Sequence, residues 1–228
     1  MENISAAVNG LLSTPGFQTL TDADIELIDK FSNVVSYKNG DIIFKQNTRT
    51  SHIMYIKSGL VKIFKEGRND KVIILKLVKS GSFIGLMSVF GDDIYQHNAS
   101  SVDNSEIIFI DIGIFRELIH KNGTFAMHLL NQISAEGLFI FEKLMSQYHK
   151  QLPGRIADVL LFFSESIYQS SVFNLPLTRR ELAEFAGTTK ESFIRTLTEF
   201  KNDRIINLDG KKVEIISMDI IKTLSRLG

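Results

Sequence analysis

The pattern of apolar and polar residues along the chain first predicts a β-rich N-terminal part. Short apolar runs begin near residue 33, with glycines between or beside them: DIIFK (41–45), HIMYIKSGLVKIFKE (52–66), KVIILKLVK (71–79) and SEIIFID (105–111). Many short strands separated by turn residues are typical of a closed β-barrel or roll. Ahead of them, TDADIELIDKF (21–31) has apolar residues on one helical face and Thr21 or Asp22 as a cap. We therefore expect a short helix followed by a β-roll.

After Asp111 the apolar period becomes helical. A short helix is predicted over 112–122, and a second over 123–150, which contains no proline and is rich in helix formers. The second helix would be about 42 Å long at 1.5 Å per residue, far longer than the average helix. Its apolar residues near heptad spacing are Leu130, Ile133, Phe141, Leu144 and Tyr148, and residues 139–141 are apolar on every side. This pattern predicts that one face covers the roll and another pairs with a second copy; the alternative is burial within a monomer.

Leu152-Pro153-Gly154 interrupts the long helix, because proline restricts the residue before it and suits the first turn of a new helix. The pattern beyond it predicts helices over 154–168, 178–186, 189–201 and 218–227. Between the last two, Asp209-Gly210 separates two β-rich arms, which indicates a hairpin. A second, mainly helical domain is therefore expected after residue 151.

The segment LTRRELAEFAGTTKESFIRTLTEF (177–200) is the most specific signal in the chain. Thr178 and Glu181 have the spacing of a capping box at the start of one helix. Gly187 ends that helix, and Thr188 or Thr189 caps the next. Two short helices joined by a glycine turn, followed by a hairpin, are typical of a winged helix-turn-helix that binds DNA.

The second of these helices presents polar residues near its start. Glu191 and Arg195 are four residues apart and share a face with Lys190 nearby. Arg can contact guanine O6 and N7, and Glu can accept a hydrogen bond from cytosine N4, so we expect these three residues to read bases. The residues placed to hold phosphates are Thr178, Arg179, Thr189 and Ser192. The alternative is that Glu191 and Arg195 form only a solvated ion pair.

The charges of the chain balance, with 26 Lys and Arg against 26 Asp and Glu. Overall charge therefore predicts no partner, and a nucleic-acid signal must be local. Residues 177–212 hold eight basic and six acidic side chains, and this small excess would bind DNA weakly at physiological salt. Two copies with recognition helices one DNA turn apart would double the contacts. We therefore expect a homodimer that binds a palindromic site.

Composition excludes several other classes. The chain has no cysteine, so disulfides, Cys-ligated zinc and cysteine-held iron–sulfur clusters are excluded. No apolar run reaches the ~18 residues of a membrane span, and the N-terminus lacks the basic flank and long apolar core of a signal peptide. We expect a cytoplasmic protein without membrane contact. No G-x-S-x-G, P-loop or H-E-x-x-H motif is present, so we expect no enzymatic activity and no certain metal site.

Taken together, the β-roll, the long helix, PGRIA (153–157) and the winged LTRRELAEFAGTTKESFIRTL (177–197) resemble the CRP/FNR superfamily of bacterial transcription regulators. The resemblance covers about residues 20–217. It implies an α+β protein with an effector-sensing β-roll domain over 1–111, a connecting and dimerisation region over 112–151, and a winged helix-turn-helix domain over 152–228. It also implies RNA polymerase as a partner. Ile194 stands where some members have a polar reader.

The resemblance also concerns the effector. In cyclic-AMP-binding members, a Glu and an Arg after G-x-F-x-G hold the ribose and the cyclic phosphate. Here Gly85 ends that motif, Leu86 replaces the Glu, and the Arg-Ser pair falls on His97-Asn98, or on Gln96-His97 without a gap. The adenine contacts of the long helix fall near Ile140 and Phe141, which are apolar. Losing a buried phosphate contact costs several kcal/mol, so we expect an effector other than cyclic AMP.

An apolar pocket between roll and helix suits haem, another apolar ligand, or side chains alone. Haem needs an axial His or Met; Met145 and His149 lie four residues apart on the long helix, and His97, His128 and Met87 are further candidates. Haem would make the protein similar to the nitric-oxide sensors that control hybrid cluster protein under nitrosative stress. The alternative function is a cyclic-nucleotide-type or ligand-free regulatory module that acts through protein contacts.

Overall fold

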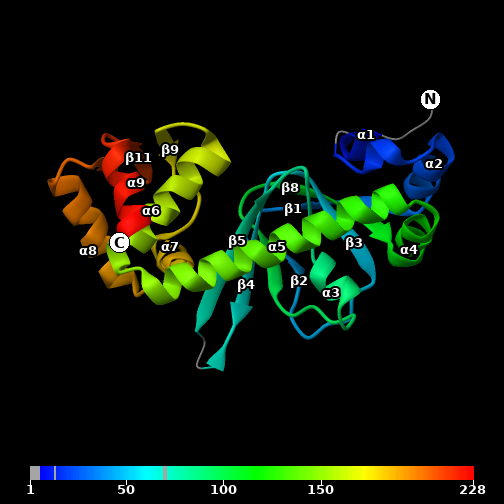
Figure 1. The fold of residues 1–228 in the computed structure, drawn as a ribbon, viewed down its shortest axis with the longest axis horizontal. Helices are drawn as coiled ribbons and strands as arrows, with labels where there is room; N and C mark the ends of the chain where they lie inside the picture. The colour runs from blue at the N-terminus through cyan, green and yellow to red at the C-terminus, as the bar shows by residue number, and fades with distance from the viewer. Residues whose placement is uncertain (1–5, 13, 69–70) are drawn as a thin grey trace. The chain divides into compact units, whose positions relative to one another are not determined.

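The computed structural model describes residues 6–12, 14–68 and 71–228. Contacts between α-carbons divide the chain into two compact units: residues 1–68 with 75–138, and residues 69–74 with 139–228. The long helix α5 (Gly123–His149) contributes residues to both units (Figure 1). Its bounds agree with the helix that the sequence predicts over 123–150.

The first unit is built around two antiparallel sheets of four strands each, ordered β1-β8-β3-β6 and β2-β7-β4-β5. The strands are β1 (Ser32–Tyr37), β2 (Ile42–Phe44), β3 (His52–Ser58), β4 (Leu60–Glu66), β5 (Val72–Lys79), β6 (Ser82–Ile84), β7 (Asn98–Ser101) and β8 (Ser105–Asp111). In the first sheet Ser32 pairs with Ile110, and in the second Val61 pairs with Ser101. The predicted β-roll is confirmed.

Helical segments precede these strands, namely α1 (Ala6–Leu12), the 3₁₀ turn η1 (Phe17–Thr19) and α2 (Asp22–Lys30), while α3 (Leu86–Phe90) lies between β6 and β7 and α4 (Ile112–Lys121) follows β8. Thr21 and Asp24 form a reciprocal capping box at the start of α2, which confirms the predicted cap. Asp111 caps α4 by accepting hydrogen bonds from the backbone N–H groups of Gly113 and Ile114. Each cap satisfies backbone donors that a helix leaves without intrahelical partners.

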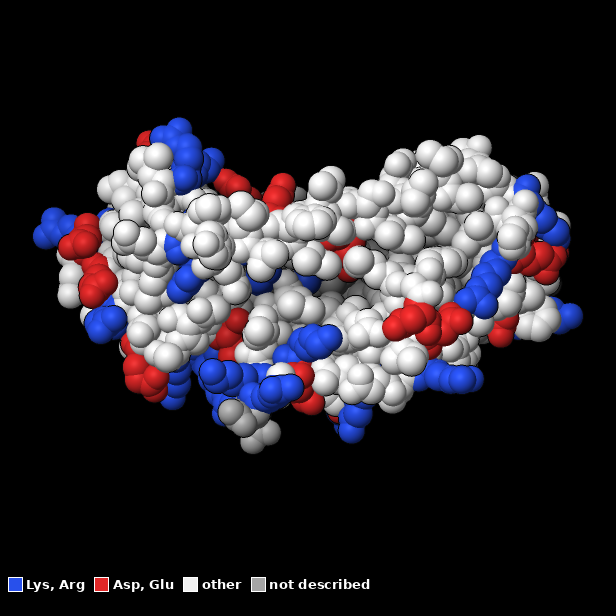
Figure 2. Space-filling view, turned by 60° about the horizontal axis from the view of Figure 1, so that its bottom comes forward, with Lys and Arg blue, Asp and Glu red and all other residues white. Residues whose placement is uncertain are grey.

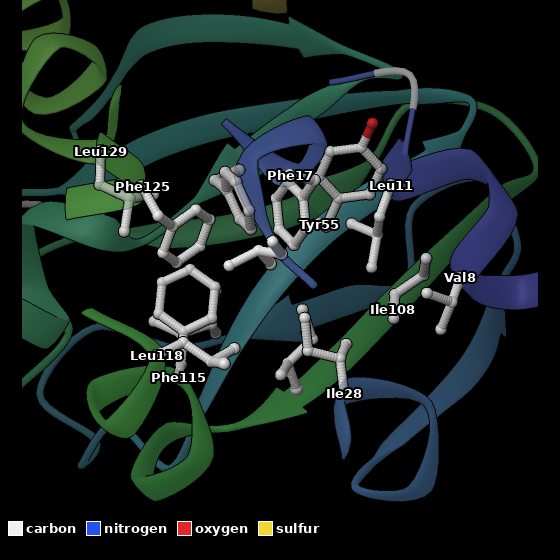
Figure 3. Close-up of a cluster of buried hydrophobic side chains, with 14 of the residues drawn as sticks. Val8, Leu11, Phe17, Ile28, Tyr55, Ile108, Phe115, Leu118, Phe125 and Leu129 are labelled. Atoms are coloured by element: carbon white, nitrogen blue, oxygen red, sulfur yellow. The ribbon is translucent and has the colours of Figure 1, made fainter. Parts of the chain in front are cut away.

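Aromatic rings fill the larger core of this unit, which Figure 3 shows in close-up. Phe17 lies 5.6 Å from Phe83 and 5.3 Å from Phe125, measured between ring centroids. Phe115 lies 5.7 Å from Phe83 and 5.4 Å from Phe125. Because Phe125 is on α5 and Phe83 on β6, this cluster fastens the start of the long helix to the sheet.

The second unit contains a three-stranded antiparallel sheet, β10-β11-β9, and the C-terminal helices. Its elements are α6 (Leu152–Leu161), the π-helical η3 (Phe162–Tyr168), β9 (Val172–Asn174), α7 (Arg179–Ala186), α8 (Lys190–Asn202), β10 (Ile206–Asp209), β11 (Lys212–Ile215) and α9 (Met218–Leu227). The predicted hairpin is confirmed, and Gly210 takes a φ of 54° in its turn.

Two details of the second unit differ from the sequence-based expectation. The helix predicted over 154–168 begins at Leu152 and becomes π-helical from Phe162. The sequence analysis also missed β9, in which Phe173 pairs with Val213 of β11. A three-residue strand has too few positions for an alternating pattern, so its pairing depends on the neighbouring hairpin.

Candidate nucleic-acid interface and effector region

The helix-turn-helix is formed by α7 and α8, and local hydrogen bonds define both of its helix starts. The Thr178 hydroxyl oxygen accepts from the Glu181 backbone N–H at 3.3 Å, while the Glu181 carboxylate accepts from the Thr178 backbone N–H at 2.9 Å. Gly187 ends α7 with a φ of 67°, a conformation that glycine adopts without strain. The Thr189 hydroxyl oxygen then accepts from the Ser192 backbone N–H at 3.2 Å. The turn between the helices is thus fixed at both ends.

The exposed face of α8 carries the predicted base-reading residues. Phe193, Leu197 and Phe200 are buried, and the helical period leaves four residues exposed near the start of the helix: Lys190, Glu191, Ile194 and Arg195. In the part of the chain that the structure describes, Glu191 and Arg195 do not form the ion pair considered as the alternative. Both side chains are therefore available for an external partner, and Ile194 is an exposed apolar residue of the same helix.

The four residues predicted to hold phosphates have roles inside the domain. The hydroxyl groups of Thr178, Thr189 and Ser192 take part in helix capping. Arg179 donates a hydrogen bond to the backbone carbonyl of Gly210 in the hairpin turn, and its partial burial lowers the pKa of its guanidinium. Arg179 thus connects the start of α7 to the wing hairpin, a contact that the sequence did not reveal.

Charged side chains of both signs lie on the face of the molecule that Figure 2 draws. On the face drawn in Figure 2, basic and acidic side chains are interspersed around a largely uncharged area. The wing contributes Lys211 and Lys212, both exposed, while Lys201 of α8 donates to the backbone carbonyl of Leu208 at 2.9 Å. This distribution agrees with the small basic excess counted in the sequence, so binding of nucleic acid depends on a few well-placed side chains.

The glycine-rich segment of the β-roll is filled by aromatic side chains. Gly85 has a φ of 79°, and a Cβ at this position would lie 2.9 Å from the Tyr95 ring. The Tyr95 ring stacks on Phe44 with 4.0 Å between centroids. Leu86 is 3% exposed and belongs to the core cluster of Figure 3. At the position where cyclic-AMP-binding members carry a Glu, this chain therefore has a core residue.

His97 and Asn98 offer no positive charge for a phosphate. Burial, and secondarily the charge of Lys65, lowers the pKa of His97 to about 4, so its imidazole is neutral at pH 7. The Asn98 side chain accepts from the Gln46 backbone N–H at 3.0 Å and donates to the Gln46 side-chain oxygen at 3.2 Å. Asn98 therefore fixes the adjoining loop, and its hydrogen-bonding groups already have protein partners.

The two residues of the long helix that were predicted to line the effector pocket belong to the second compact unit, not to the unit that contains the β-roll. Ile140 and Phe141 are 44% and 66% exposed, and both belong to residues 139–228. Met145 is 51% exposed and His149 is also exposed. The four side chains lack the apolar enclosure that haem requires. Met145 and His149 therefore do not fit a haem site as the single chain presents them.

Sequence reasoning also missed a cluster of charged residues in the second unit, formed by Lys143, Lys150, Arg155 and Asp158. Lys150 and Asp158 form an ion pair at 2.8 Å, and Lys143 lies over the Phe185 ring at 3.7 Å from its centroid. The available signal was the seven-residue spacing of Lys143 and Lys150, which places both on one face of the long helix.

A β-roll of the cyclic-nucleotide-binding type and a winged helix-turn-helix define the chain as a DNA-binding transcription regulator. Comparisons with known families support this class. The family model of the cyclic nucleotide-binding domain matches residues 34–122, and that of the Crp-like helix-turn-helix domain matches residues 154–224. The chain belongs to the CRP/FNR family of transcription regulators.

Among curated proteins, the chain is 23% identical over 201 residues to the cAMP-activated global transcriptional regulator CRP of Salmonella typhimurium, covering 86% of this chain and 95% of the relative. It is 21% identical over 220 residues to the anaerobic regulatory protein of Bacillus subtilis, covering 89% and 87%. Among solved structures, FixK2 of Bradyrhizobium japonicum superposes with a TM-score of 0.78 at 16% identity, covering 85% and 96%. The likeness to FixK2 shows a common fold.

Among the residues that the structure describes, no helix is both long and apolar enough to cross a membrane. Within the same residues, no three His, Cys, Asp or Glu side chains lie close enough together to hold a metal ion.

Proposed function

We propose that this regulator acts as a homodimer whose subunits associate through α5. The observation that carries the proposal is an exposed apolar stripe along this helix. Its members follow one another mostly at three- or four-residue intervals: Met127, Leu130, Leu138, Phe141, Leu144, Met145 and Tyr148. Leu138, Phe141 and Leu144 are each more than 60% exposed, and Tyr148 is 83% exposed. In a single chain these side chains would remain in water.

The free energy gained by burying this stripe favours association with a second copy of the chain. Burial of one large apolar side chain contributes about 1.5–3 kcal/mol. Several such side chains together offset the free-energy cost of association, about 4–15 kcal/mol. A twofold axis along the helix would place each stripe against its own copy, as in isologous dimers. The proposed partition into a β-roll domain, a dimerisation region and a DNA-binding domain follows from this arrangement.

In the proposed dimer, two copies of α8 read the half-sites of a palindromic operator. Arg195 and Glu191 would contact base edges with Lys190 beside them, while Arg179 and the capped starts of α7 and α8 would lie near phosphates. The support is the exposure of Glu191 and Arg195 without a mutual ion pair. We further propose that the DNA-bound dimer acts through contacts with RNA polymerase.

We also propose that the β-roll senses an effector other than cyclic AMP. The support is the burial of Leu86, the neutral state of His97, and the pairing of Asn98 with Gln46. Haem, and nitric oxide through it, remains the candidate taken from the sequence. The exposure of Met145 and His149 gives it no support in the single chain.

Selection of binding sites from random DNA duplexes tests the proposed function. We expect recovered sites to contain two inverted half-sites whose centres lie about one helical turn apart, bound by two chains per duplex in analytical ultracentrifugation. Recovery of a single half-site bound by one chain would contradict the dimeric mode. A chain ending before residue 177 that retained regulatory activity would favour the module acting through protein contacts.

A further inference from the structure

A cavity of about 280 Å³ lies within the second unit. It is bordered by the C-terminal part of α5, by the adjoining α6 and η3, and by the end of α7. Aromatic rings form part of its wall, contributed by Phe139, Phe162 and Phe185. Its charged lining consists of Glu142, Lys143, Lys150, Arg155 and Asp158. A concave site with aromatic walls and a few convergent charges is the usual form of a small-molecule site.

The carboxylate of Asp158 is fully engaged within the protein. Its two oxygens accept from the Lys150 ammonium at 2.8 and 2.9 Å. They also accept from the hydroxyl groups of Ser146 at 2.7 Å and Ser225 at 2.6 Å. Asp158 and Lys150 therefore neutralise each other. The other two cations of the cavity, Lys143 and Arg155, have no comparable ion pair with a carboxylate among the described residues.

The ammonium group of Lys143 places a positive charge at the cavity wall, and few contacts stabilise this charge. Its ammonium lies 3.7 Å from the centroid of the Phe185 ring and donates to the backbone carbonyl of Ile74 at 3.0 Å. Both partners are neutral groups. Burial lowers the pKa of Lys143 to about 7, although the charge of Asp158 opposes this shift. A bound anion would stabilise the protonated form.

Arg155 supplies a second cation and an unused donor. Its Nη1 donates to the backbone carbonyl of Gln147 at 3.3 Å, but its Nε is buried without a hydrogen-bond partner. A guanidinium stays protonated in proteins, so this N–H cannot be removed by titration. A buried donor left without a partner is costly, particularly on a charged group. An oxygen in the cavity would satisfy it.

We propose that this cavity binds a small organic monocarboxylate with an aromatic or short aliphatic body. Three cations against two carboxylates leave one positive charge in the lining, which matches a monoanion better than a phosphate dianion. The carboxylate would accept from Arg155 and Lys143, and the apolar body would lie among the three phenylalanine rings.

The cavity is connected to the turn of the helix-turn-helix through the side chain of Gln147. Gln147 lines the cavity, and a Cβ at Gly187 would lie 2.8 Å from the Gln147 side-chain nitrogen. The Gln147 side chain thus packs against the turn that joins α7 to α8. A ligand that displaces or orders Gln147 changes the support of that turn, so the site is suited to alter DNA affinity.

Isothermal titration of the full-length protein with benzoate and with hexanoate tests the proposal. We expect saturable binding of at least one acid and at least tenfold weaker binding of the matching neutral amide, benzamide or hexanamide. Arg155→Gln and Lys143→Met should each weaken binding at least tenfold, with unchanged melting temperature as the check on folding. Lys222→Met, an exposed lysine of the same unit, should have no effect.

The pH dependence provides a second readout. Lys143 loses its proton as the pH rises through about 7, so affinity for the acid should fall between pH 6 and pH 8, and this fall should disappear in Lys143→Met. The proposal is overturned if neither acid binds saturably, if the amides bind as well as the acids, or if phenyl phosphate binds more tightly than benzoate. It is also overturned if both folded variants bind like the wild type. None of these binding outcomes depends on dimerisation or operator choice.

Discussion

Arg195 and Glu191 are available to DNA because the apolar residues of α8 occupy its buried face. Phe193 is fully buried and Leu197 is 1% exposed. Their spacing turns Arg195 outward together with Glu191, four residues before it. At this scale, the buried residues of α8 decide which side chains point outward.

We predict that Arg195→Ala removes specific binding. Loss of a bidentate contact to guanine costs about 1–3 kcal/mol per half-site, so affinity for the selected palindrome should fall at least tenfold while affinity for random DNA changes little. Fluorescence anisotropy with both duplexes measures the difference. Arg226→Ala, on α9 of the same unit, controls for loss of one positive charge. Equal affinity of Arg195→Ala and wild type for the palindrome would refute the assignment.

Arg179→Ala should act differently. Because Arg179 donates to the Gly210 carbonyl, its loss loosens the wing hairpin as well as removing a positive charge. Binding to the palindrome and to random DNA should then weaken by similar factors, with a shallower dependence on salt. A loss confined to the palindrome in the same anisotropy titrations would instead place Arg179 at a base.

His97 provides a prediction about stability. Its pKa is about 4 in the folded protein against an ordinary value of 6.5, so below pH 6.5 the unfolded chain binds a proton that the folded chain excludes. Stability should therefore fall as the pH drops from 6.5 to 4, by on the order of 3 kcal/mol at most. Urea unfolding of His97→Gln should lack this component, whereas His120→Gln, at an exposed histidine, should keep it. If the stability of His97→Gln depended on pH in the same way as that of the wild type, the proposed effect of His97 burial would be contradicted.

The α5 element combines two environments along one helix. Near its start, Phe125 and Leu129 are buried in the core of the first unit. Along another face, from Met127 to Tyr148, large apolar side chains are exposed in the single chain. A helix that leaves so many apolar residues in water normally has a partner.

We predict that Leu144→Glu disrupts the dimer. A charge placed in the apolar stripe of both copies would be buried without a partner and would face its own copy. Sedimentation equilibrium should show a monomer, and operator affinity should fall by at least tenfold because the half-sites are no longer bound together. Ile220→Glu, at an exposed isoleucine of α9, is the matched control and should leave the dimer intact. A dimeric Leu144→Glu protein would exclude this face of α5 as the interface.

For the whole molecule, the lining of the β-roll decides which class of effector this domain can bind. The β-roll has kept the left-handed glycine of a nucleotide cradle, but Tyr95 packs against Gly85, and a leucine follows that glycine. An apolar segment of this kind gives a cyclic phosphate no charged partner.

We predict that cyclic AMP neither binds saturably nor changes operator affinity. The buried Leu86 and neutral His97 give the phosphate and ribose no compensation for lost hydration. Isothermal titration with cyclic AMP measures this, and saturable binding would refute it. A parallel haem titration tests the other candidate: a saturable Soret shift that is lost in Met145→Leu or His149→Ala would restore these residues as ligands.

The sequence by itself determined the main elements and their class, apart from β9 and the π-helical η3. Glycine spacing, the capping pairs at Thr21 and Thr178, and the break at Pro153 are local signals, and the helices and hairpin that they predict are present. The recognition face of α8 also followed from helical periodicity. These features depend on residues close together in the sequence, where one period or one cap decides the conformation.

Only the tertiary structure decided which distant residues meet. It placed Tyr95 against Gly85, Arg179 against Gly210, and Gln147 against the turn at Gly187. It also gathered Lys143 and Arg155 around one cavity, although each reads as an ordinary surface cation in the sequence. Burial and the loss of hydrogen-bond partners arise from packing between elements, and no local pattern encodes them.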